Sequence, residues 1–268
     1  MPIVRANGVD LHTMVLGEEG PLLFMLHGLV VGSVATWCFQ FAPALAKKYR
    51  VVLFDMRGHG MSEKSLTGFD LPTMAADLAG LIRFYQGEYH QLGKPVYLVG
   101  HSYGALVMLH YAAHHQLQDW PDVASMVVVD APLPASRFIY PSMREMVTPE
   151  RVDENAREAL TKLGISGRRR QQKLSEHFRY LYLESSMRRD IESSADIDDD
   201  LLASFSMPVK LIYGEHSDCL SAGERLARLI PESELQVLPC GHYITVELPG
   251  QLARLINHYL EVPADGER

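Results

Sequence analysis

The chain has 268 residues, a formal net charge of −8 and hydrophobic residues at 47% of its positions. This length accommodates one large α/β domain or two ordinary ones, with a core that needs no disulfide or metal to stabilise it. The acidic balance argues against nucleic acid or an anionic membrane as the main partner.

The three cysteines and the first residues of the chain bear on its location. Three is an odd number in a chain this long and is typical of reduced thiols in a cytosolic protein. Residues 1–5 lack the apolar core of a signal peptide, and no stretch reaches the length of a membrane span. We therefore expect a cytoplasmic protein without a membrane span, as a monomer or a homodimer.

A β-hairpin is expected first, because apolar and polar residues alternate around Asn7-Gly8, a strong type I′ turn signal. Short, continuously apolar runs follow, as strands covered on both faces require. They are residues 22–26, 51–54, 96–99, 126–129, 209–213 and 235–238. Helical patterns lie between them at 41–49, 71–85, 105–116, 222–229 and 251–260. This order predicts an α/β fold with a mostly parallel central sheet and helices on both faces.

The alternation breaks between residues 132 and 206, where no strand pattern occurs and helical patterns cover 150–163 and 171–188. We interpret this stretch as a helical lid inserted after the sixth strand, because it leaves and returns at strand ends where such sheets bind ligands. The expected domains are a core of residues 1–131 and 207–268 and a lid of residues 132–206. Alternatively, these helices only cover the sheet.

Gly100-His101-Ser102-Tyr103-Gly104 directly follows the apolar run 96–99 and precedes a helical pattern. A strand, then Gly-x-Ser-x-Gly, then a helix is typical of a nucleophile elbow, a sharp turn that holds the serine hydroxyl above the sheet. The two glycines suit a place where strand and helix pass too close for a Cβ. We therefore predict that Ser102 is a nucleophile.

A serine hydroxyl needs a base to take its proton, and a histidine base needs a carboxylate to fix its tautomer. In an elbow-containing α/β fold these groups follow in the order Ser, acid, His. His242, after the last predicted strand, is the expected base. We predict Asp218, just past residues 209–213, as the acid, with Glu215 and Asp130 as the alternatives.

The negative oxygen formed by nucleophilic attack needs preformed donors, usually two backbone N–H groups. One is expected from Tyr103, the residue after the nucleophile. The other is expected from Leu29 in the His27-Gly28-Leu29 loop that follows residues 22–26. We expect His27 to brace this loop by hydrogen bonding, and His101 to pack against the sheet.

Together these motifs resemble the α/β-hydrolase superfamily, in its lidded group of esterases, thioesterases, lactonases and carbon–carbon bond hydrolases. Residues 55–62, Asp-Met-Arg-Gly-His-Gly-Met-Ser, add a turn similar to that group's Asp-x-Arg-Gly-x-Gly-x-Ser. Ser102 at the elbow excludes the aspartate nucleophile of epoxide hydrolases and haloalkane dehalogenases of this fold. The sequence His-Gly-Leu-Val differs from the His-Gly-Gly-Gly of the hormone-sensitive-lipase branch.

The resemblance implies hydrolysis of an ester, thioester or lactone of a small to medium apolar acyl compound, without metal or cofactor. The basic runs 168–170 and 188–189 are expected to be solvated helix faces, and the alternative is that they dock an anionic carrier that bears the acyl group. Open alternatives are acyl transfer, cyclisation, lyase or carbon–carbon cleavage chemistry, and a ligand receptor of this fold. Fold alone does not decide among them. The expected substrate-binding residues are His27, Gly28, Trp37, Phe138, Tyr140, Phe178 and Tyr182, with Phe39 and Met187 as further walls.

Overall fold

The computed structural model describes residues 2–162 and 167–260. Residues 163–166, within the expected lid, and residue 1 and residues 261–268, within the expected core, lie outside the described part. Eight strands form one sheet in the order β1-β2-β4-β3-β5-β6-β7-β8. They are β1 Ile3–Ala6, β2 Val9–Leu16, β3 Leu22–Leu26, β4 Arg50–Phe54, β5 Val96–His101, β6 Val123–Val129, β7 Val209–Gly214 and β8 Ser233–Leu238.

The sheet is mostly parallel, as the sequence predicts. Strand β2 runs antiparallel to β1 and β4, and the pairs from β4 through β3, β5, β6 and β7 to β8 are all parallel. The hairpin joining β1 and β2 turns at Asn7 and Gly8, whose φ angles are 48° and 79°. Positive φ at both central residues is what a type I′ turn requires.

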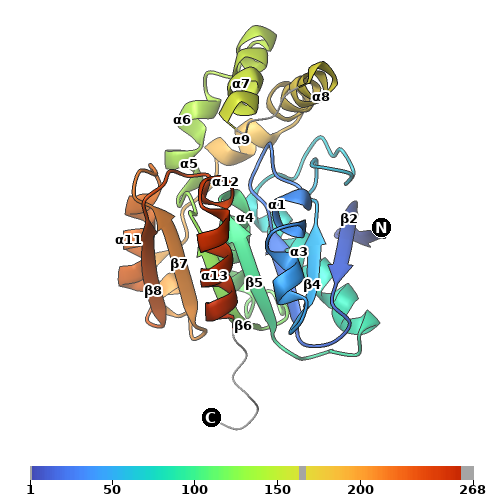
Figure 1. Cartoon of the computed structure of the whole chain (residues 1–268), viewed down its shortest axis with the longest axis vertical. Coiled ribbons are helices and arrows are strands. Elements are labelled where there is room, and N and C mark those ends of the chain that lie inside the picture. Colours follow the sequence, from blue (N-terminus) through green and yellow to red (C-terminus); the bar gives the residue numbers. More distant parts are fainter. Residues whose placement is uncertain (1, 163–166, 261–268) are drawn as a thin grey trace.

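Helices cover both faces of the sheet (Figure 1). Helices α1 (Ala35–Cys38), α2 (Ala42–Leu45), α12 (Ile244–Glu247) and α13 (Pro249–Tyr259) contribute buried residues to the core on one face. Helices α3 (Leu71–Glu88), α4 (Tyr103–His114) and α11 (Leu220–Leu229) contribute to the core on the other. Successive β3 residues alternate between these cores: Leu23 joins the first and Phe24 the second. Burial on both faces explains why the strands are continuously apolar.

Residues 132–206, here called the insertion, lie between β6 and β7, and their described part consists of helices, turns and irregular segments. Figure 1 shows α6 to α9 above the carboxyl ends of the parallel strands. The helices are α5 Ala135–Phe138, α6 Tyr140–Met143, α7 Pro149–Lys162, α8 Arg168–Arg179, the π-helix η1 Tyr180–Glu184, α9 Met187–Glu192 and α10 Asp199–Ala203. The single helix expected over residues 171–188 is thus divided, because Ser185 has extended backbone and ends η1.

Two further expectations concern the cysteines and the membrane. All three cysteines, Cys38, Cys219 and Cys240, are free thiols. Within residues 2–162 and 167–260, no helix combines the length and apolar character needed to cross a bilayer.

Candidate active site

Ser102 occupies the sharp turn between β5 and α4. Its φ of 54° and ψ of −125° are strained for a residue with a side chain. The flanking glycines permit the turn: a Cβ on Gly104 would lie 2.4 Å from the His27 carbonyl oxygen, and one on Gly100 would lie 2.8 Å from the Ala105 backbone. The structure therefore has the elbow geometry that the Gly-x-Ser-x-Gly motif predicts.

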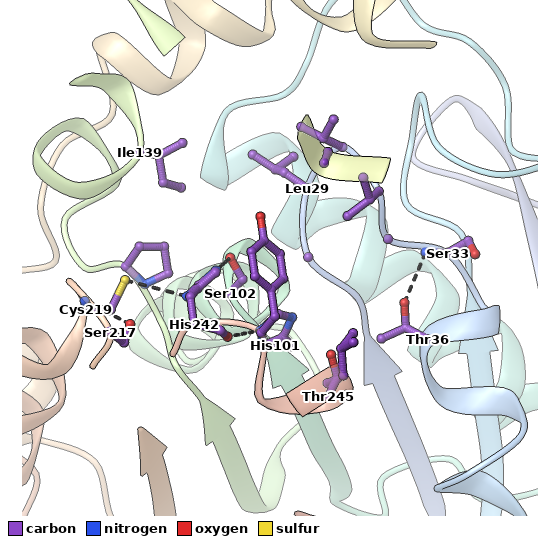
Figure 2. A pocket seen from close by; sticks show the side chains of 18 of the residues that line it. Leu29, Ser33, Thr36, His101, Ser102, Ile139, Ser217, Cys219, His242 and Thr245 are labelled. Carbon is purple, nitrogen blue, oxygen red and sulfur yellow. Dashed lines mark hydrogen bonds between the residues drawn. The ribbon is translucent and has the colours of Figure 1, made fainter. Parts of the chain in front are cut away.

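A continuous chain of hydrogen bonds starts at Ser102. The Ser102 Oγ lies 2.9 Å from His242 Nε2, and His242 Nδ1 lies 2.6 Å from Asp130 Oδ2. Figure 2 shows the serine and the imidazole facing each other at the floor of a cavity. Because an ionised carboxylate only accepts hydrogen bonds, Nδ1 carries the proton and Nε2 is left as an acceptor for the serine hydroxyl.

Asp130 is completely buried, and each oxygen of its carboxylate has a donor. Oδ1 accepts the Gly214 N–H at 2.8 Å, while Oδ2 accepts the Ser217 hydroxyl at 2.5 Å in addition to His242. These hydrogen bonds compensate for removal of the carboxylate from water. The Asp130 backbone has a φ of 49°, a second strained turn at a strand end.

The carboxylate that bonds His242 is therefore Asp130, one of the two alternatives, and the first choice of Asp218 is corrected. Asp218 is exposed on the loop between β7 and α11. Strand β6 lies between β5 and β7, so Asp130 directly follows the strand beside Ser102. The loop after β8 brings His242 back across β7, where Gly214 makes room: a Cβ there would lie 2.3 Å from the Gly241 carbonyl oxygen.

The loop after β3 lies against the nucleophile, as predicted for a donor of hydrogen bonds to the oxyanion. A Cβ on Gly28 would lie only 3.1 Å from the Ser102 Cβ. Among the described residues, no acceptor takes the N–H of Leu29 or of Tyr103. Both amides are therefore free to donate to a substrate oxygen. The Tyr103 side chain points elsewhere, since its hydroxyl donates to the Phe69 carbonyl.

Histidines on three segments hold this loop. His27 is fully buried; its Nδ1–H donates to the Gly28 carbonyl and its Nε2 accepts the Met56 N–H, the bracing role expected of it. His59 Nε2 accepts the Val30 N–H at 2.9 Å. His177, on α8 of the insertion, lies near the Val30 carbonyl and packs edge-on against His59, with ring centroids 5.4 Å apart.

The roles of His59 and His177 were not anticipated from the sequence. His59 lies in the turn of residues 55–62, which the motif identifies as structural, and only the fold shows that it reaches the β3 loop. Val30 itself has a φ of 69°, unusual for a β-branched residue, and the hydrogen bond to His59 stabilises that conformation. Through the ring contact between His177 and His59, the insertion packs against the residue that holds the loop beside the nucleophile.

A cavity of about 810 Å³ opens above Ser102 and His242. On the core side, the cavity is lined by the β3 loop, α1 and the loops after β7 and β8. The insertion supplies a largely apolar wall, consisting of Pro132, Phe138, Ile139, Ser142, Met143, Asn155, Ala159, Phe178 and Tyr182. The position of these residues fits the interpretation of the insertion as a lid.

Of the expected substrate-binding residues, Gly28, Phe138, Phe178 and Tyr182 line the cavity, as does Phe39. The other four do not. Trp37 is fully buried and packs edge-on against Phe41 in the core beneath α1. Met187 is buried in the core, and Tyr140 is half-buried outside the cavity lining. His27 lies behind the β3 loop, where it braces the cavity wall without lining the cavity.

Two buried groups beside His242 are neutral near pH 7. His101 donates its Nε2–H to the His242 carbonyl at 3.0 Å, and burial together with the neighbouring His242 lowers the pKa of its imidazole to about 4. Burial and the Asp130 charge raise the pKa of the Cys219 thiol to about 12. Cys219 Sγ lies 3.9 Å from His242 Nδ1.

Asp130, Cys219 and His242 are also close enough together to be considered as metal ligands, with potential ligand atoms within 4.8 Å of one another. Their chemistry fits a hydrogen-bonded relay better. The His242 Nδ1 and Asp130 Oδ2 atoms are already bonded to each other, and the Cys219 thiol is held in its protonated form, which is a poor ligand.

The known proteins that this chain resembles have the same fold. The family model described as alpha/beta hydrolase fold matches residues 21–164, slightly more than half of the chain. Mouse protein phosphatase methylesterase 1 is 31% identical over 115 residues, which cover 42% of this chain and 28% of that protein. The chain thus matches less than a third of that relative's length.

Two other similarities extend over nearly the whole chain. The 2-(acetamidomethylene)succinate hydrolase of Mesorhizobium japonicum is 26% identical over 269 residues, covering 91% of this chain and 89% of that protein. The enol-lactonase of Burkholderia xenovorans LB400 superposes with a TM-score of 0.75 at 19% identity, over 97% of this chain and all of that one, a likeness of fold alone. On the family match and the eight-stranded sheet, the chain belongs to the alpha/beta hydrolase fold family.

Proposed function

We propose that this protein is a serine hydrolase that cleaves an ester, thioester or lactone through a covalent acyl-enzyme. The observation that carries the proposal is the hydrogen-bonded series Ser102–His242–Asp130 at the floor of the cavity. The serine is on a strained elbow, the imidazole has its acceptor nitrogen toward the hydroxyl, and the carboxylate is buried with all its donors in place.

The reaction has two halves. His242 Nε2 takes the proton from the Ser102 hydroxyl as its oxygen attacks the carbonyl carbon. The Asp130 carboxylate stabilises the imidazolium that forms, through the bond to Nδ1. The Leu29 and Tyr103 amides donate to the negative oxygen, and the imidazolium then protonates the leaving alcohol or thiol. In the second half, water loses a proton to His242, attacks the acyl-enzyme and releases the acid.

The insertion acts as the lid of this site in our proposal. Its residues supply about half of the apolar lining of the cavity, and His177 lies against the β3 loop that provides one oxyanion donor. An apolar wall suits an acyl chain, and exclusion of bulk water strengthens hydrogen bonds to the developing negative charge.

The test uses p-nitrophenyl hexanoate with the wild-type protein and with Ser102→Ala. We expect continued release of nitrophenol above the spontaneous rate, lost in the variant, and labelling of Ser102 by a fluorophosphonate. A single burst without turnover would favour acyl transfer or single-turnover sensing. Absence of both ester cleavage and labelling in a folded protein would refute the proposal.

A further inference from the structure

We propose that the cavity selects acyl substrates without a negative charge and rejects those that carry a carboxylate or phosphate near the reacting carbonyl, with Asp218 as the residue that sets this preference. This inference rests on the proposed hydrolase function and narrows its substrate class.

The lining of the cavity lacks the groups that recognise anions. Of the described residues that form it, none is a lysine or an arginine. Carboxylates and phosphates in protein sites are usually held by these side chains, above all by the planar guanidinium. The histidines do not replace them: His101 is neutral because its pKa is lowered to about 4, and the His242 N–H is already donated to Asp130.

Asp218 adds a negative charge to this lining. It lies between the buried Ser217 and Cys219, but its own side chain is exposed at the cavity wall. No cation pairs with it in the part of the chain that the structure describes. The Asp130 carboxylate is buried behind His242, so Asp218 is the charged carboxylate that a substrate anion would meet in the cavity lining, with no lysine or arginine beside it.

Four cationic residues of the insertion form a separate group. Arg168, Arg169, Arg170 and Lys173 line a separate hollow at the start of α8, together with Gly167. This hollow shares no residue with the catalytic cavity. These cations therefore do not compensate a charge bound beside Ser102.

The uncharged part of the lining defines what the cavity does accept. Phe138, Phe178 and Tyr182 provide aromatic surface for an alkyl or aryl acyl group. Asn155 and Ser142 provide neutral hydrogen-bonding groups on the insertion side. Such a cavity accommodates an apolar chain with a neutral polar substituent and leaves an ionised substituent without a partner.

The experiment compares three esters of equal chain length. They are p-nitrophenyl hexanoate, mono-p-nitrophenyl adipate, which carries a terminal carboxylate, and methyl p-nitrophenyl adipate, which is neutral but equally polar. Rates measured with Ser102→Ala give the background. We expect kcat/KM for the monoanion to be about tenfold or more below that for hexanoate, and the neutral diester to lie within about threefold of hexanoate.

Asp218→Asn identifies the responsible residue. We expect it to raise the ratio of kcat/KM for the monoanion to that for hexanoate about three- to tenfold, and Asp218→Lys to raise the ratio further. Glu215→Gln is the matched control, because Glu215 is an exposed acid on the same loop that does not line the cavity, and its removal should leave the ratio unchanged.

The outcomes separate the two proposals. Cleavage of none of the three esters above background refutes the hydrolase function itself. Cleavage of the monoanion as efficient as that of hexanoate refutes the charge selectivity while the hydrolase function stands. A ratio that Asp218→Asn leaves unchanged, or that Glu215→Gln changes equally, removes Asp218 from the role assigned to it.

Discussion

Replacing Asp130 by asparagine is the most direct test of the relay. The carboxylate receives three donors: the Gly214 N–H, the Ser217 hydroxyl and His242 Nδ1. An amide keeps the shape but replaces one accepting oxygen with an NH₂ group. When that group faces His242, Nδ1 becomes the acceptor and the imidazole proton moves to Nε2, where it faces the nucleophile and cannot take the serine's proton.

The expected loss follows from the change of tautomer. Loss of the correct tautomer in a Ser–His–Asp relay lowers kcat by about 10⁴, which corresponds to about 5 kcal/mol of barrier. Folding is affected less, because a buried hydrogen bond to a charged group contributes about 1.5–3 kcal/mol to stability. Asp130→Asn should therefore remain folded at 25 °C with almost no activity.

The assay measures kcat/KM for p-nitrophenyl hexanoate in Asp130→Asn, Asp218→Asn and Glu215→Gln, with the thermal unfolding midpoint of each as a folding control. Fluorophosphonate labelling of Ser102 should slow in parallel in Asp130→Asn, because the same base activates the serine. We expect Asp218→Asn to stay within about tenfold of wild type, since one exposed charge changes a rate by no more than this. Our assignment of the acid is refuted if Asp218→Asn loses a thousandfold while Asp130→Asn keeps more than a tenth of the activity.

Three further perturbations test the surroundings of the site. Gly28→Ala places a Cβ 3.1 Å from the Cβ of Ser102, so the loop that carries the Leu29 amide must move. Displacement of this oxyanion donor should lower kcat about 10²–10³-fold with KM little changed. An unchanged kcat would contradict this expectation. Arg57→Ala leaves Asp77 buried without its bidentate partner, so the free energy of unfolding in urea should fall by about 3–5 kcal/mol. Burial lowers the pKa of His101 and of His177 to about 4, so between about pH 6.5 and pH 4 the folded state binds fewer protons than the unfolded state. The free energy of unfolding should therefore fall as the pH drops from about 6.5 to 4, by up to about 1.4 kcal/mol per pH unit for each histidine. His177→Gln should make this loss shallower; an unchanged slope would show that this histidine does not contribute.

The sheet and the elbow could be predicted because local sequence determines them. A strand buried on both faces must be apolar at every position, so β3 and the other inner parallel strands stand out from the helices between them. Strand β8 is less buried, and its prediction began two residues late, at 235 instead of Ser233. The turn at Ser102 requires glycine where β5 and α4 approach each other, and the two glycines of the motif therefore identify the turn in the sequence.

The cavity walls could be predicted only in part, because the direction of a helical side chain depends on the neighbours of its helix. Trp37 and Phe39 are two residues apart around α1, yet the first points into the core and the second is 79% exposed at the cavity rim. Within the insertion, Phe138 and Tyr140 are both half-buried, yet only Phe138 lines the cavity. Aromatic residues in such short helices carry no periodic pattern that distinguishes a core position from a wall.

The position of the acid required the order of the strands in space. The requirement that an acid lie between the serine and the histidine in the sequence is met equally by Asp130 and Asp218. Strand order distinguishes them: β6 pairs with β5, so the residue directly after β6 lies beside the residue directly after β5. Each backbone is then fixed by its own strand, and only the loop that carries His242 must span the intervening β7. Asp218 would place the acid in a second loop, so two of the three groups would depend on loop conformation. In this chain the relay is built from two strand ends and one loop. The exposed carboxylate of Asp218 takes no part in it, and in our proposal it repels negatively charged substrates.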